Sequence, residues 1–264
     1  MFKHRHIPPE QVIAAEPYTA LAQIYDQVMN HVDYDHWARH LIRLARLHGV
    51  EPRTVLDVSC GTGTLCREFQ SRGFRVLGCD ASLPMVKIAA AFRSSRAAIP
   101  YWCTAMDRVA IRTPVELVLS SYDSMNYLLE PQQWQSAFQR LHELLVPGGL
   151  FIFDISTLRN STETFADYVH QEEFAEESYR RTSLFDAERN IQYNYFEIEL
   201  SSAPGCLYKE VHSQSIRALA QVEDFIALSP FTLLGQYANF TLRPGSERAE
   251  RVHFVLKKGR ETCM

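Results

Sequence analysis

Residues 55–64 read VLDVSCGTGT, a short apolar run that leads into two glycines. The apolar residues at 55, 56 and 58 predict a short parallel strand that is buried on both faces. Gly61 and Gly63 allow a sharp turn whose backbone can approach a ligand with no Cβ in the way. Thr64 is placed to cap a following helix, whose free N–H groups favour an anion. The stretch therefore predicts a strand–turn–helix unit that binds a nucleotide.

A second signal is the stretch RVLGCD, which ends at Asp80, about twenty residues after Gly61. An acid at the tip of a second strand is placed to accept hydrogen bonds from the two hydroxyls of a ribose. The dinucleotide fingerprint G-x-G-x-x-G fits poorly, because Cys66 takes its third position and Asp57 lies inside the first strand. An NAD-dependent reductase is therefore a distant alternative.

The pattern D-x-S-C-G-T-G at residues 57–63 resembles motif I of the class I S-adenosylmethionine (SAM) dependent methyltransferases. The usual form in that family is D-x-G-x-G-x-G, so Ser59 departs from it. The turn Pro147-Gly148-Gly149 before a later strand also resembles the family. The resemblance implies SAM as cofactor, with these binding residues: Asp57, Ser59, Gly61, Gly63, Asp80, Ala81, Met85, Met106, Asp107 and Ser121.

Two of these positions keep alternatives open. Asp57 either fixes the turn by accepting backbone N–H bonds or, by resemblance, also holds the methionine ammonium of the cofactor. In the stretch CTAMDRV, the position where many relatives carry an acid is Ala105. Met106 is then expected to meet the adenine, as Met85 is, and Asp107 either replaces the acid or is a solvated turn residue.

The segment YDQVMNHVDYDHWARHL, residues 25–41, is similar to the N-terminal lid helices of small-molecule methyltransferases. In that family an aromatic residue such as Tyr25 or Trp37 covers the cofactor. A sulfonium cation gains about 0.5–2 kcal/mol against an aromatic face. The alternative for both residues is plain core packing.

Composition limits the partners. The 264 residues carry a net charge of −4, which argues against a nucleic-acid surface and favours a small-molecule partner. No apolar run approaches the about 18 residues that cross a bilayer. No C-x-x-C pair occurs among the six cysteines, and the start of the chain has no apolar signal region. We therefore expect a cytoplasmic protein. His36 and His40 lack the glutamate of a zinc motif, so no metal is expected.

Strand and helix signals alternate from residue 52 to about residue 157, which predicts an α/β fold. We expect a Rossmann-like, doubly wound, mostly parallel seven-stranded sheet with an antiparallel last strand. Short alternating runs within residues 160–218 predict a small antiparallel β cap insertion. The expected organisation is lid helices in 1–50, a SAM-binding core in 51–157 and 219–264, and a cap in 158–218. Residues 1–15 are expected to form a mobile arm.

Candidate chemistry lies at two places. Ser121, Tyr122 and Asp123 follow the fourth expected strand, where the ligand crevice of this topology forms. Glu210, His212 and Gln214 alternate along one strand face, so His212 is a candidate base or substrate ligand, or a structural histidine. Arg217 is a further candidate, as a ligand of a substrate carboxylate.

We predict methyl transfer to N or O of a small-molecule acceptor, with Tyr122 and His212 as candidate catalytic residues. The alternative is a SAM- or S-adenosylhomocysteine-binding protein without catalysis, such as a sensor or the partner of an enzyme. Ser59 and Ala105 motivate this alternative. The identity of the acceptor and the oligomeric state stay open.

Overall fold

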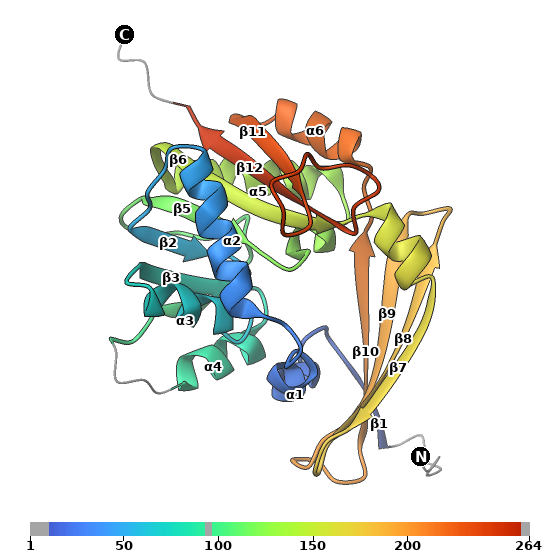
Figure 1. Cartoon of the computed structure of the whole chain (residues 1–264). Coiled ribbons are helices and arrows are strands. Elements are labelled where there is room, and N and C mark those ends of the chain that lie inside the picture. Colours follow the sequence, from blue (N-terminus) through green and yellow to red (C-terminus); the bar gives the residue numbers. More distant parts are fainter. Residues whose placement is uncertain (1–10, 93–96, 260–264) are drawn as a thin grey trace.

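The computed structural model describes residues 11–92 and 97–259 and contains two sheets (Figure 1). One sheet has seven strands in the order β11-β12-β6-β5-β2-β3-β4, and the other has five in the order β1-β10-β9-β8-β7. The seven strands are β2 (Thr54–Asp57), β3 (Arg75–Asp80), β4 (Tyr101–Cys103), β5 (Val115–Ser120), β6 (Leu145–Ser156), β11 (Phe231–Ala238) and β12 (Arg251–Lys258). The helices are α1 (Leu21–Val28), α2 (Tyr34–Leu47), α3 (Thr64–Ser71), α4 (Leu83–Ala91), α5 (Pro131–Glu143) and α6 (Leu219–Ala227), with one 3₁₀ turn (Ser124–Tyr127) and one π turn (Asn160–Thr164).

The central strands of the seven-stranded sheet are buried on both faces, as their apolar sequences predict. Along β5, Leu117 and Leu119 pack with α2 and α3, whereas Val118 packs with α5 and α6 on the opposite face. Successive side chains of a strand point to opposite faces, so a strand covered by helices on both sides must be apolar throughout.

Strand directions place the site. β2 runs parallel to both β3 and β5, and β12 runs antiparallel to β6. After β2 the chain adds β3 and β4 on one side of β2, and it then adds β5 on the other side. A ligand crevice forms where the order of strands reverses in this way, at the carboxyl ends of the strands. The predicted fold class, including the antiparallel last strand, is confirmed.

The five-stranded sheet consists of β1 (Val12–Ala15), β7 (Asp167–Glu173), β8 (Ser178–Asp186), β9 (Ile191–Glu199) and β10 (Leu207–Ser215). β7 to β10 are antiparallel neighbours, and β1 joins β10 in parallel. Residues 12–15 are thus a strand and not part of an irregular arm, because the edge of β10 offers them backbone partners. The rest of the expected arm, residues 1–10, lies outside the described residues.

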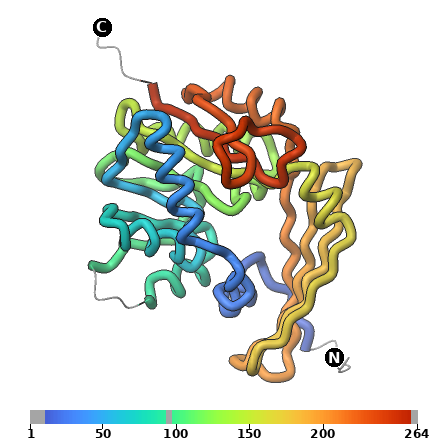
Figure 2. Tube along the Cα trace, viewed as in Figure 1, coloured from blue at the N-terminus to red at the C-terminus, as the bar shows by residue number. Residues whose placement is uncertain are grey.

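Helix α1 lies between the two sheets in Figures 1 and 2. Leu21 and Ile24 of this helix pack against Tyr179, Phe196 and Ile198 of the second sheet. The segment before the helix is therefore held against the second sheet and close to the strand ends of the first.

One local expectation was wrong. Thr64 is the first residue of α3 and not its cap; the capping position is Gly63, whose φ of +82° favours glycine. Helix α4 ends at Ala91, and residues 93–96 lie outside the described residues. No helix in residues 11–92 or 97–259 has both the length and the apolar character needed to cross a membrane.

Candidate active site

The glycine turn is closed by two carboxylates. Asp57 Oδ1, at the end of β2, accepts a hydrogen bond from the N–H of Ser59 at 3.1 Å. Asp80, at the end of β3, accepts from the N–H groups of Gly61 and Ser82, both at 2.9 Å. Burial raises the pKa of Asp57 to about 7, although the Ser59 N–H opposes this rise, and burial also raises the pKa of Asp80. Both carboxylates shape the turn through backbone bonds.

The two glycines of the turn have different reasons to be glycine. A Cβ on Gly61, at φ +53°, would meet no atom within 4 Å, so this side of the turn leaves room for a ligand. A Cβ on Gly63, at φ +82°, would lie 2.5 Å from the hydroxyl of Tyr101. Gly61 therefore opens the turn, and Gly63 permits the packing beneath it.

A narrow cavity of about 40 Å³ lies over the turn. Asp57, Ser59 and Gly61 line it from below, and Tyr25 and Tyr122 line it from the sides. The hydroxyl of Ser121, which also lines it, is buried and has no hydrogen-bond partner within residues 11–92 and 97–259. A buried polar group without a partner is costly, so this cavity suits a polar ligand.

The turn after β5 holds an unusual backbone conformation. Tyr122 and Asp123 have φ values of +62° and +51°, a region that residues with a side chain rarely adopt. The carboxylate of Asp154 on β6 accepts both of their N–H groups at 2.8 Å. Arg251 on β12 bonds Asp154 and pairs with Asp123 at 2.8 Å, so two strands of the sheet fix this turn.

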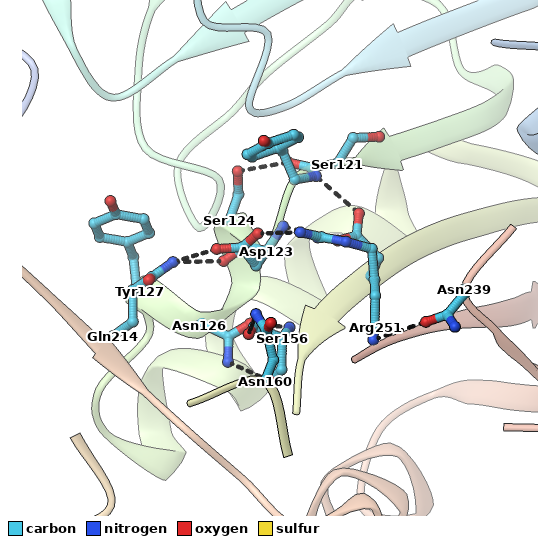
Figure 3. Close-up of polar contacts among 12 residues, drawn as sticks. Ser121, Asp123, Ser124, Asn126, Tyr127, Ser156, Asn160, Gln214, Asn239 and Arg251 are labelled. Carbon is cyan, nitrogen blue, oxygen red and sulfur yellow. Dashed lines mark hydrogen bonds and ion pairs between the residues drawn. The ribbon is translucent and has the colours of Figure 1, made fainter. Parts of the chain in front are cut away.

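Asp123 lies between Arg251 and Gln214 in Figure 3, and Gln214 of β10 donates to its carboxylate. This contact links the turn to the second sheet. The ring of Tyr122 lies 5.6 Å from that of Trp37, and the guanidinium of Arg251 lies 5.0 Å from its centre. Burial raises the pKa of Tyr122 to about 12. Its ring is thus held in one place at the edge of the narrow cavity.

A larger cavity of about 490 Å³ lies between the strand ends and the second sheet. Its lining comes from α1, from the turn after β5 and from all four antiparallel strands β7 to β10. Tyr25 and Tyr122 line this cavity as well as the narrow one. The two spaces therefore meet at these two rings.

Comparisons with known proteins agree with this geometry. Residues 55–149 match the family profile of a methyltransferase domain. A putative methyltransferase of Geobacillus sp. strain WCH70 is 29% identical over 245 residues, which cover 91% of this chain and 99% of that protein. The chain carries a methyltransferase domain.

Solved structures share the fold of this methyltransferase. A SAM-dependent methyltransferase from Clostridium acetobutylicum superimposes with a TM-score of 0.78 at 21% identity, covering 92% of this chain and 99% of the other. The sugar N-methyltransferase KedS8 from Streptoalloteichus sp. gives a TM-score of 0.71 at 17% identity, covering 90% and 93%. Because each match covers at least 90% of this chain, the shared fold extends beyond the nucleotide-binding core.

The residues over the glycine turn fit SAM, the cofactor of this family. Gly61 leaves space beside the backbone, Asp57 offers a carboxylate to an ammonium group, and the unpaired Ser121 hydroxyl offers a further polar contact. Tyr25 and Trp37 both line the narrow cavity, and Tyr25 alone of the two also lines the larger one.

The residues expected at the ribose and adenine lie at the end of β3, at the start of α4 and after β4, and they line neither cavity. Met85 is buried in α4, Met106 is half-buried against the core, and Ala81 and Asp107 are exposed. Asp107 approaches the neighbouring Arg108 at 3.9 Å, as a turn residue would. Their contacts with the cofactor stay predictions.

His212 of the methyltransferase belongs to a buried hydrogen-bonded chain. Its Nε2 lies 3.0 Å from the carboxylate of Glu210, and its Nδ1 lies 2.9 Å from the hydroxyl of Tyr127. Tyr127 in turn lies 2.7 Å from the hydroxyl of Tyr18. Glu210 also accepts the backbone N–H groups of residues 18–21 at 2.5–3.0 Å.

The sequence alone identified only some members of this hydrogen-bonded series of side chains. The alternation along β10 placed Glu210, His212 and Gln214 on one face, and all three are buried there. It did not identify Tyr18 or Tyr127, which come from distant segments. Arg217 lines neither cavity; it donates to the carbonyl of Leu129. Among residues 11–92 and 97–259, no group of three or more His, Cys, Asp and Glu could hold a metal ion.

Proposed function

We propose that this methyltransferase transfers a methyl group from SAM to a nitrogen or oxygen of a small molecule bound in the larger cavity. The observation that carries the proposal is the meeting of the two cavities at Tyr25 and Tyr122. SAM supplies, when bound, a methyl group on a positively charged sulfur. Alignment of acceptor and methyl group in such a site is worth about 7–11 kcal/mol at most. The similarity to a sugar N-methyltransferase supports a small acceptor.

The proposed cofactor contacts follow from the turn. Asp80 is assigned to the ribose hydroxyls, and Asp57 to the methionine ammonium. The rings of Tyr25, Trp37 and Tyr122 are assigned to the sulfonium, because a cation is favoured against aromatic faces. Residues 1–50 serve as a lid in this proposal, and the narrow volume of about 40 Å³ implies that the lid shifts when a nucleotide enters.

The acceptor proton is assigned to the chain that ends at His212. A carboxylate only accepts, so His212 donates from Nε2 to Glu210 and its Nδ1 is free to accept a proton. Tyr127 then donates to Nδ1, and Tyr18 donates to Tyr127. A proton leaving the acceptor passes to the oxygen of Tyr18, then through Tyr127, and ends on Nδ1 of His212, where Glu210 balances the new charge. Tyr122 orients the acceptor beside this path.

The remaining proposals concern organisation and location. Residues 51–157 and 219–264 form the cofactor-binding core, and residues 158–218 form the cap that selects the acceptor. The net charge of −4 favours a small acceptor over nucleic acid. The described cysteines, Cys60, Cys66, Cys79, Cys103 and Cys206, are all free, which favours a reducing, cytoplasmic location.

The non-catalytic alternative loses one of its two reasons. The Ser59 hydroxyl accepts from the Ser121 N–H at 3.1 Å and lies 3.3 Å from the Ser120 hydroxyl. Ser59 therefore joins the glycine turn to the turn after β5. The serine that replaces the glycine of the family pattern thus makes hydrogen bonds that a glycine could not make. Ala105 is the reason that stays.

A methyl-transfer assay tests the proposal. Purified protein is mixed with radiolabelled SAM and a panel of amino sugars, amines and phenols, and formation of S-adenosylhomocysteine is measured. We expect turnover with at least one acceptor class. We expect His212→Gln to lower kcat by about 10²-fold near neutral pH, because general bases contribute about 10²–10⁴-fold. The loss should shrink as pH rises, because the acceptor then arrives deprotonated.

His170→Gln is the matched control, since His170 also lines the larger cavity but lies outside the hydrogen-bonded chain. It should keep most of the activity. Binding of S-adenosylhomocysteine without turnover of any acceptor would favour the non-catalytic alternative. An unchanged kcat in His212→Gln would remove the base from the mechanism and leave alignment alone.

A further inference from the structure

Arg181 lies on β8, next to the edge strand β7 of the second sheet, and its side chain lines the larger cavity. Its cross-strand neighbours are His170 on β7 and Phe196 on β9. Its Nε donates to the hydroxyl of Ser183 at 3.0 Å, and its Nη2 donates to the side-chain oxygen of Asn194 at 2.8 Å. Both partners are neutral, so they orient the guanidinium without compensating its charge.

No carboxylate compensates that charge within the part of the chain that the structure describes. Among the described residues, no carboxylate oxygen of an Asp or Glu lies within 4.0 Å, the limit for an ion pair, of a nitrogen of Arg181. Of the two carboxylates that line the cavity, Asp123 pairs with Arg251 at 2.8 Å, and Glu172 approaches His170 at 3.7 Å. A half-buried cation without a counter-charge is costly, which is a reason to expect the counter-charge on the ligand.

The aromatic surroundings of Arg181 fix the plane of its guanidinium. Its Cζ lies 4.5 Å from the ring centre of Phe165, 5.8 Å from Tyr168 and 5.9 Å from Phe196. Aromatic rings stack on the flat face of a guanidinium, so the N–H groups at its edge stay available for hydrogen bonds. The two N–H groups of Nη1 have no partner among the described residues. Arg181, which lines the larger cavity, therefore has two N–H donors that are available to a ligand.

The charge of Arg181 also acts across the cavity. Burial raises the pKa of both Tyr122 and Tyr127, and the positive charge of Arg181 opposes this rise in each case. Both tyrosines line the same cavity as Arg181, and Tyr122 also lines the narrow cavity. Because this shared cavity has a volume of about 490 Å³, a group bound at Arg181 would lie within one small molecule's length of the proposed methyl-transfer position.

We infer that Arg181 binds an anionic oxygen group of the acceptor, a carboxylate or a phosphate, through the free edge of its guanidinium. This inference rests on the proposed function, because it takes the larger cavity as the acceptor site. A guanidinium offers parallel N–H donors that match the oxygens of both groups. The acceptor class is then an anion whose apolar body lies against the aromatic walls and whose separate nitrogen or oxygen reaches Tyr25 and Tyr122.

Binding of small probes tests this inference without knowledge of the acceptor. Protein saturated with S-adenosylhomocysteine is titrated with benzoate, phenyl phosphate and neutral benzamide, followed by ligand-observed NMR at millimolar concentrations. We expect at least one anion to bind about tenfold more tightly than benzamide, which corresponds to about 1.4 kcal/mol. The stronger of the two anions distinguishes a carboxylate site from a phosphate site.

Arg181→Gln should abolish the preference for the anion. Arg180→Gln is the matched control, because Arg180 precedes Arg181 on the same strand and its side chain points to the opposite face. Affinity for S-adenosylhomocysteine and the thermal midpoint show whether each variant is folded. Equal affinity for benzamide and both anions, or an anion preference that survives Arg181→Gln, would overturn the inference. Failure to methylate any acceptor would count against the proposed function alone, since probe binding is read separately.

Discussion

The two sides of the active site are built in opposite ways. On the cofactor side, the contacts that shape the glycine turn join residues close in sequence, from Asp57 to Ser59 and from Asp80 to Gly61. On the acceptor side, Glu210 holds the backbone of residues 18–21, and Gln214 reaches Asp123. The difference teaches that the turn at the proposed cofactor site is shaped mainly by residues 57–82, whereas the proposed acceptor site depends on how distant segments assemble.

The turn after β5 belongs to both sides. Tyr122 lines both cavities, and Asp154 holds its strained backbone from the neighbouring strand. Ser59 bonds this turn from the cofactor side, and Gln214 bonds it from the second sheet. A substitution that disturbs this turn should therefore weaken both cofactor and acceptor binding, whereas a substitution elsewhere should weaken only one of them.

The largest effect is expected from Asp154→Asn. This change removes one charge from a buried group of Asp154, Arg251 and Asp123, and breaking such a group costs about 3–5 kcal/mol. We expect a loss of about 3 kcal/mol in the free energy of unfolding, measured by urea denaturation. Affinity for both S-adenosylhomocysteine and acceptor-site anions should fall together.

Asp167→Asn is the control for this change, because Asp167 is an exposed residue at the start of β7. It should alter the free energy of unfolding by less than about 0.5 kcal/mol. A loss below about 1 kcal/mol in Asp154→Asn would mean that the conformation of the turn does not depend on this carboxylate.

A one-sided effect is expected from Asp80→Ala. The variant loses the proposed ribose contact and the acceptor of the Gly61 N–H, so affinity for S-adenosylhomocysteine should fall at least tenfold in a calorimetric titration. Binding of anions at Arg181 should stay unchanged. Unchanged cofactor affinity in a folded variant would contradict the assignment of Asp80. Asp107→Ala tests the shifted acid in the same assay, and a loss smaller than twofold would identify Asp107 as a turn residue only.

The same contrast explains what could be predicted from the sequence. The alternation of strands and helices and the glycine turn depend on periodicity and on residues a few positions apart, so the fold class was predictable. The position of His212 beside Glu210 followed from the two-residue period of a strand. Arg181 was not identified, because its role depends on the absence of a nearby carboxylate. Tyr18 was not identified either, because its place beside His212 depends on the pairing of β1 with β10 and on the bond from its N–H to Glu210, both of which join distant segments.

The smallest effect is expected from pH. Burial raises the pKa of Asp57 to about 7, so its carboxylate is largely protonated at pH 6 and ionised at pH 8. Because this pKa lies above the ordinary value of 3.8, the contribution of Asp57 to folding stability falls as pH rises toward and through 7. An ammonium bound at Asp57 favours the ionised form. Affinity for S-adenosylhomocysteine should therefore rise several-fold, and at most about tenfold, between pH 6 and pH 8.

Asp57→Asn should remove this rise, because an amide does not titrate in that range. Anion binding at Arg181 should be nearly independent of pH over the same interval, since a guanidinium keeps its charge and a carboxylate probe stays ionised. A pH dependence that survives in Asp57→Asn would assign it to another group and leave Asp57 only its backbone bond to Ser59. If only the affinity of the wild-type protein for S-adenosylhomocysteine depends on pH, the proposed cofactor and acceptor sites differ in their response to protons. They would then differ in this respect as well as in the sequence separation of their contacts.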